Sequence, residues 1–272
     1  MMIGHGFRMI MVTLMVAAAT CITTSASLQP LKVEPSRFVF EGMPGEQITG
    51  SIVVRNTGQE TATPQALLSD WSLDEVNRLV VLEAGSLNSS LEGWIKFNPR
   101  RFQMAPAGAQ TVRFTIRIPH DAQPGERRGM IAFEQSAPYG EEAIGAITRV
   151  QVTATIYVAV LPVERSVDIV GLYIQPHEDS SNSTLVIQLK GTGNGHFRGT
   201  GRFRILPDEG EPPLFSGDLE PIIVMPDVVT RFLGNIEQEL TPGRYRLAIE
   251  ITPEEVGGVL LHRVYAFEVP ES

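Results

Sequence analysis

The twelve residues RVQVTATIYVAV, from Arg149 to Val160, carry the pattern that decides the fold. An apolar side chain stands at every second position, and mostly polar or small side chains stand between. A period of two places these two sets on opposite faces of a β-strand. We therefore predict a strand here, with one face turned into a core. The apolar set is Val150, Val152, Ala154, Ile156, Val158 and Val160.

Shorter runs elsewhere in the chain repeat this alternation. QITGSIVVRN, from Gln47 to Asn56, and TVRFTIRI, from Thr111 to Ile118, each place apolar residues on one face. Turn residues such as Pro124-Gly125 and Pro242-Gly243 separate the runs, and helical periodicity is nearly absent. Many short strands divided by turns are typical of all-β sandwiches. We therefore predict an all-β protein.

The strand landmarks occur twice along the 272 residues, which is enough chain for two domains. In both halves a strand and a Thr-Gly turn are followed by a proline, a loop and Arg-Phe, and then by a Pro-Gly strand. We predict two tandem immunoglobulin-like β-sandwiches, over residues 27–163 and 164–272, with the boundary near LPVERS. The paired landmarks are IVVRNTGQ and IQLKGTGN, PAGAQTVRF and PDVVTRF, and PGERRGMIAFE and PGRYRLAIEI.

The N-terminus has the features of an export signal. Arg8 precedes the apolar run MIMVTLMVAAATCI, and small residues follow it up to Ala26. This arrangement predicts a signal peptide over residues 1–26, because the apolar run is too short to span a membrane as a helix. We expect a periplasmic protein; acylation of Cys21 and display at the cell surface are the alternatives. Since Cys21 is the only cysteine, the mature chain would contain none.

Composition and spacing argue against several classes of function. The net charge of −9 disfavours nucleic-acid binding. The histidines show no metal-binding spacing, and no Gly-x-Ser-x-Gly motif is present. A carbohydrate-active enzyme would need paired carboxylates in a cleft, whereas acidic neighbours such as Glu254-Glu255 point to opposite faces of an extended chain. We therefore predict a protein that is not an enzyme and that uses no cofactor or metal.

The glycine-rich stretch KGTGNGHFRGTGRFR, from Lys190 to Arg204, allows two interpretations. A phosphate-binding loop leads into a helix, but the residues after Gly201 alternate as a strand does. The matching stretch in the first half, Asn56-Thr57-Gly58, is an ordinary turn. We therefore predict a loop between strands, and the alternative of an anion site rests on Arg198, Arg202 and Arg204.

The strand from Arg149 to Val160 also suggests how the protein could bind a partner. If it lies at a sheet edge, its unpaired backbone groups would accept another chain as an added strand. The alternative is a strand that is covered on both sides.

Residues Leu31 to Pro162 resemble the N-terminal domain of periplasmic pilus-assembly chaperones. The resemblance is carried by VEPSRFVFEG, IVVRNTG, WIKFNPRRFQMAP and QTVRFTIRIPHD. It implies that Arg37 anchors the C-terminal carboxylate of a subunit, and that the strand ending the domain is donated to that subunit. The family also has a lysine on this strand, and none lies between Arg149 and Pro162. The implied subunit-binding residues are Arg37, Val150, Val152, Ala154, Ile156 and Val158.

The second half of the chain is instead similar to accessory sandwich domains of exported surface proteins. We therefore expect a periplasmic chaperone-like protein that binds fimbrial or other surface subunits by strand addition. An outer-membrane assembly partner is a further expectation. The alternative is a structural or adhesive module that binds a surface protein or a polysaccharide. An accessible strand beside Arg37 would favour the chaperone, and a strand buried between two neighbours would favour the module.

Overall fold

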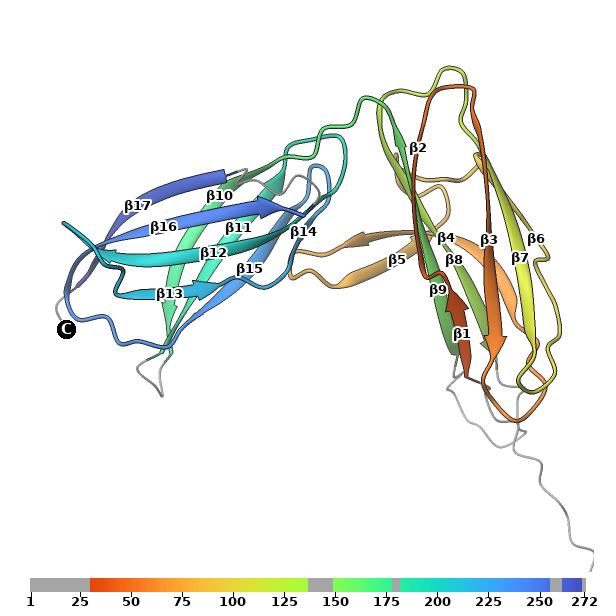
Figure 1. Cartoon of the computed structure of the whole chain (residues 1–272), viewed down its shortest axis with the longest axis horizontal. Helices are drawn as coiled ribbons and strands as arrows, with labels where there is room; N and C mark the ends of the chain where they lie inside the picture. Colours follow the sequence, from red (N-terminus) through yellow and green to blue (C-terminus); the bar gives the residue numbers. More distant parts are fainter. Residues whose placement is uncertain (1–29, 137–148, 178–181, 255–260, 271–272) are drawn as a thin grey trace, which may run out of the picture.

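The computed structural model describes residues 30–136, 149–177, 182–254 and 261–270, so the predicted signal peptide lies outside the described residues. Within this part the chain forms strands and no helix, and it builds the two β-sandwiches predicted from the sequence (Figure 1). The first contains β1 (Leu31–Glu34), β2 (Arg37–Gly42), β3 (Gln47–Asn56), β4 (Gln65–Leu73), β5 (Leu79–Glu83), β6 (Ile95–Asn98), β7 (Ala109–Arg117), β8 (Gly125–Ser136) and β9 (Arg149–Val160). The second contains β10 (Val167–Pro176), β11 (Ser183–Gly191), β12 (Phe197–Pro207), β13 (Phe215–Asp218), β14 (Ile222–Val224), β15 (Val229–Ile236), β16 (Gly243–Pro253) and β17 (Leu261–Val269).

The first sandwich packs a sheet of order β1-β3-β7-β6 against a sheet of order β2-β9-β8-β4-β5. The apolar faces predicted for β3 and β7 point into the core between these sheets. Ile52, Val54 and Ile116 are completely buried there, and Phe114 is nearly so. The period of two therefore identified the buried face of both strands correctly.

The chain changes sheets between β1 and β2. β1 pairs with β3, and β2 then runs parallel to β9 in the opposite sheet. Pro35 lies at the change, and a proline has no N–H to continue a strand ladder. Phe38 and Phe40 of β2 pack edge-on against Phe114, with ring centres 5.1 and 6.1 Å away. These rings close the gap between the two sheets at this side of the sandwich.

The second sandwich repeats the pairing of the first. Its sheets have the orders β10-β11-β15 and β13-β12-β16-β17, and β14 also pairs with β12. The repeated sequence landmarks fall on β3 and β11, on β7 and β15, and on β8 and β16. In the first domain β3 pairs with β7, and in the second domain their counterparts β11 and β15 pair with each other in the same way. The second core is a separate cluster of apolar side chains around Phe203 and Phe232.

The glycine-rich stretch forms the joint between the two domains. It ends β11, crosses to the opposite sheet and begins β12, so it is the loop between strands that we predicted. A Cβ on Gly193 would overlap the carbonyl of Glu164 in the linker, which explains the glycine. The N–H of Gly195 donates to the same carbonyl, and the N–H of Glu126 in β8 donates to the carbonyl of Asn194.

Apolar contacts complete this joint. Trp71, Met130 and Tyr157 on the outer face of the β2-β9-β8-β4-β5 sheet pack against Met225 of the second domain. The hairpin of β4 and β5 also extends toward the second domain (Figure 1), where the N–H of Arg231 donates to the carbonyl of Glu75. The domains are thus held together by packing as well as by the linker.

Candidate functional site

The two halves of β9 have different surroundings. Residues Thr155–Val160 lie between β8 and β2, whereas residues Arg149–Ala154 pair with β8 alone among the described strands. One edge of this N-terminal half, called the uncovered edge below, therefore has no hydrogen-bonded strand among those that the structure describes, although β1 comes close to β9. The sequence allowed either an edge strand or a strand covered on both sides. The N-terminal half of β9 has the first arrangement, and the C-terminal half has the second.

The hydrogen bond of Thr155 shows which backbone groups of β9 point toward the uncovered edge. The N–H of Thr155 donates to the carbonyl of Ser36, at 2.9 Å, on the side of β2. Alternate residues of a strand direct their N–H and C=O groups to the same side. Gln151 and Thr153 therefore present their backbone donors and acceptors along the uncovered edge. A further strand would find hydrogen-bonding partners there.

The side chains predicted to bind a subunit lie differently from that expectation. Ala154, Ile156 and Val158 are completely buried and belong to the core of their own domain. Val152 is partly buried against the same core, and Val150 pairs with Gln135 through the strand ladder. The period of two places Val152, Ala154, Ile156 and Val158 on one face, and in the structure that face fills this chain's own core. At its uncovered edge β9 offers backbone groups.

Arg37 begins β2, directly beyond the end of the uncovered edge. It lies opposite Thr155 in the strand register, and its side chain is exposed. Its guanidinium carbon lies 5.4 Å from the centre of the Tyr157 ring. That ring, on the outer face of the sheet, stacks on His196 of the second domain with 4.6 Å between ring centres. Arg37 therefore stands beside the contact between the domains.

Arg198 approaches the same tyrosine from the second domain. It lies two residues after His196, so the two side chains share a side of the extended chain. Burial raises the pKa of the Tyr157 hydroxyl, while the charges of Arg198 and Arg37 and a hydrogen bond from Arg198 act to lower it. The buried Nε of Arg198 has no hydrogen-bond partner among the residues that the structure describes, and its guanidinium lies 3.9 Å from the exposed carboxylate of Glu254.

The other two arginines of the glycine-rich stretch do not join this cluster. Arg202 pairs with Asp218 at 3.2 Å, and Arg204 pairs with Glu250 at 2.6 Å. Both charges are thus balanced on the second domain itself. Of the three arginines that kept an anion site open as an alternative, only Arg198 approaches Tyr157 beside Arg37.

Beside these cations a buried pair of side chains joins the domains. Nδ1 of His196 lies 2.6 Å from the carboxylate of Glu126 on β8, and both side chains are almost inaccessible to solvent. The guanidinium of Arg165 in the linker lies 4.0 Å from the same carboxylate. The sequence contained no signal for this pair, because its two members lie 70 residues apart.

Two other kinds of site receive no support from the described residues. No group of three or more His, Cys, Asp or Glu side chains lies close enough there to hold a metal ion. The same part of the chain contains no helix of the length and hydropathy needed to cross a membrane.

Comparison with known proteins gives structural matches only. No family model matches the sequence, and no curated protein matches it. The solved structures most similar to this chain include the class 5 fimbriae chaperone CfaA, at a TM-score of 0.46, with 10% identity over 89% of this chain and 100% of that one. The YadV chaperone follows at a TM-score of 0.45, with 8% identity over 87% and 99% of the two chains.

A third similar structure is the pre-assembly complex of the chaperone CsuC with the tip subunit CsuE, from archaic chaperone-usher pili of Acinetobacter baumannii. Its TM-score is 0.45, with 11% identity over 87% of this chain and 97% of that chain. The structural neighbours are therefore chaperones of fimbrial assembly.

Proposed function

We propose that this protein is a periplasmic chaperone that captures exported fimbrial or surface subunits by pairing with an extended strand at their C-terminus. The observation that carries this proposal is the uncovered edge of β9, which ends where Arg37 begins β2. Backbone pairing along Gln151 and Thr153 would supply affinity that is largely independent of the subunit's sequence.

The charge of Arg37 sets the direction of the added strand. A strand that runs parallel to β9 along its uncovered half would meet the start of β2 with its C-terminus. Its terminal carboxylate would then approach Arg37, whereas an antiparallel strand from the same C-terminus would place its carboxylate at the far end of the edge. Attraction between the carboxylate and Arg37 therefore favours the parallel strand.

Arg198 would be the second cation that holds the carboxylate. β9 carries no lysine beyond Arg149, but Arg198 reaches the same tyrosine from the second domain. An arginine can donate two hydrogen bonds to one carboxylate, and such charged bonds are stronger than neutral ones. Capture would then depend on both domains, and on the angle between them.

Strand pairing is tested by removing a single backbone donor. In Thr153→Pro the N–H that points to the uncovered edge is lost, while the ladder to β8 uses the neighbouring residues. Thr153→Val retains the N–H and is the matched control. Tagged full-length chains are exported in the native host, and proteins bound to the wild type in the periplasm are identified by mass spectrometry. We expect Thr153→Pro to lose that subunit and Thr153→Val to retain it.

The carboxylate anchor is tested on the same subunit. Arg37→Gln and Arg198→Gln should each reduce the amount of bound subunit at least tenfold, which corresponds to about 1.4 kcal/mol or more. A subunit with one extra glycine at its C-terminus should bind less well to the wild type, because its carboxylate is displaced. Unchanged capture by both arginine variants would refute the anchor while leaving strand pairing intact.

The burial of Ile156 and Val158 favours a second candidate, a structural or adhesive module that binds through fixed sheet faces. Such a module would bind its partner through side chains and would not use the edge of β9. If the wild type, Thr153→Pro and Arg37→Gln all bound the same partner equally well, the result would favour the structural or adhesive module over the chaperone.

A further inference from the structure

In the second domain, the sheet that contains β12 and β16 has the strand order of its counterpart in the first domain, but no described strand takes the position of β2. In the first domain, β2 lies beyond β9 in the order β2-β9-β8-β4-β5. In the second domain, the equivalent order is β17-β16-β12-β13, and no described strand lies beyond β17. The cause is the path of β10, which pairs with β11 along its whole length instead of crossing to the other sheet as β2 does.

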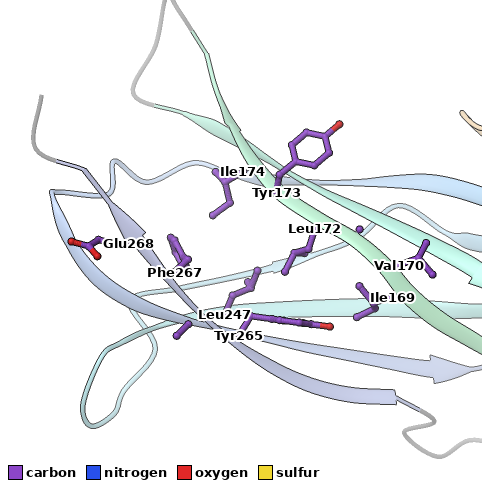
Figure 2. Close-up of a pocket in the computed structure, with 11 residues that line it drawn as sticks. Ile169, Val170, Leu172, Tyr173, Ile174, Leu247, Tyr265, Phe267 and Glu268 are labelled. Carbon is purple, nitrogen blue, oxygen red and sulfur yellow. The ribbon is translucent and has the colours of Figure 1, made fainter.

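An apolar groove occupies the position of the missing strand. It lies between β10 and β17 and has a volume of about 590 Å³. Figure 2 shows Leu172 and Ile174 from β10 and Tyr265 and Phe267 from β17 along the groove, with Glu268 toward one end. These apolar side chains belong to the edge of the second core and are only partly buried.

The first domain shows which kind of segment fills such a gap. There β2 runs parallel to β9 and places Phe38 and Phe40 between the two sheets. The strand ladders align β9 with β17. Gly125 and Gly243 are the glycines of the two repeated Pro-Gly turns; Gly125 pairs with Val160 of β9, and Gly243 pairs with Val269 of β17. Ile156 and Val158 then correspond to Tyr265 and Phe267, and all four side chains face inward.

The same register identifies a charge beside the groove, on the outer face of β17. Glu41 of β2 lies beside Ala159, and Ala159 corresponds to Glu268. The carboxylate of Glu268 is largely exposed, and its nearest cation, Arg244, is 3.9 Å away and equally exposed. A segment in the groove would therefore be stabilised by a basic residue at the position that Glu41 has in β2.

We propose that the groove between β10 and β17 binds an extended segment of a partner protein that runs parallel to β17. This segment places large apolar side chains at alternate positions over Leu172, Tyr265 and Phe267, and a basic side chain beside Glu268. The surface is separate from β9 and Arg37, so it would serve a different partner segment from the one captured in the proposed function.

The test uses two peptides that copy Ser36–Gly42, each acetylated at the N-terminus and amidated at the C-terminus. One has the natural sequence, and the other has lysine in place of Glu41. Each is added, up to about 1 mM, to isotope-labelled mature protein, a range that detects weak binding by NMR. We expect the lysine peptide to shift the amide signals of β10 and β17, with an affinity about two- to fivefold higher than that of the natural peptide.

A charge reversal on the protein provides the decisive comparison. Glu268→Lys should reverse the preference, so that the natural peptide binds more tightly than the lysine peptide. Glu239→Lys, an exposed charge reversal outside the groove, should leave the preference unchanged. The proposal is overturned if neither peptide shifts the signals of β10 and β17, if the shifts map to the first domain, or if Glu268→Lys has the same preference as the wild type.

Discussion

At the scale of single residues, the contact between the domains depends on a few buried polar side chains. His196 touches Glu126 through its ring nitrogen and Tyr157 through its ring face. A buried charged or polar group is costly unless it has a partner, so each of these side chains requires the others. The positions of Arg37 and Arg198 at Tyr157 therefore depend on the same side chains that fix the angle between the domains.

Removing Glu126 should destabilise the joint. Glu126→Ala leaves His196 buried without its partner, which costs about 1–3 kcal/mol. The expected result is a lower urea midpoint for the transition that separates the domains, followed by intrinsic fluorescence. Glu41→Ala, on an exposed side chain, should change the midpoint little. Equal midpoints for Glu126→Ala and the wild type would show that the pair contributes nothing.

Tyr157 should make stability depend on pH in the alkaline range. Burial raises the pKa of its hydroxyl, so the folded state favours the neutral phenol. The stability that this provides is complete below the ordinary tyrosine pKa of about 10 and is lost as pH rises through the higher pKa of the folded state. Urea midpoints measured from about pH 8 to about pH 11 should fall more steeply for the wild type than for Tyr157→Phe. Parallel curves would contradict this assignment.

At the scale of elements, the alternating runs predicted the strands well. The run from Gln47 to Asn56 is β3, and the run from Arg149 to Val160 is β9, residue for residue. A period of two is a local property, so it predicts which face of a strand is buried. It does not predict which neighbour lies at the strand's edge, because that depends on the path of a distant segment such as β2. The division of β9 into a covered and an uncovered half was therefore not predictable.

The glycine-rich loop offers a test at this scale. Gly193→Ala would place a methyl group on the carbonyl of Glu164, and a backbone atom cannot move aside as a flexible side chain can. We expect a loss of about 1–3 kcal/mol, seen as a lower midpoint of thermal unfolding. Thr200→Ala, at an exposed position on β12, is the control. A midpoint for Gly193→Ala equal to that of the control would mean that the loop and linker separate freely.

At the scale of the whole molecule, two independent cores are joined by a small apolar contact. The cores are separate clusters, and Met225 is the fully buried residue that the second domain contributes to the contact between them. Arg37 and Arg198 lie near the same tyrosine only at the resulting angle. We therefore expect changes at the joint to alter the relative positions of Arg37 and Arg198 while each domain stays folded.

Met225→Asp tests this independence. A charge buried against Trp71 and Tyr157 should open the joint while both sandwiches stay folded. Because the mature chain is predicted to lack cysteine, spin labels can be attached to cysteines that replace Glu41 and Glu239, one in each domain. The distance distribution between the labels should broaden in Met225→Asp, and capture of the subunit should be lost. Met43→Asp, at a side chain that is 51% exposed, should change neither, and an unchanged distribution in Met225→Asp would contradict the role of the joint.

The sequence by itself determined the all-β class, the repeated landmarks and the inward faces of β3, β7 and β9, because these follow from local periodicity and turn chemistry. Its resemblance to pilus-assembly chaperones indicated Arg37 as a residue that binds a carboxylate. Only the tertiary structure decided that Arg198 shares a tyrosine with Arg37, that His196 pairs with Glu126, and that no described strand lies beyond β17. Each of these depends on segments far apart in the chain, whose approach is set by the packing of whole sheets and domains.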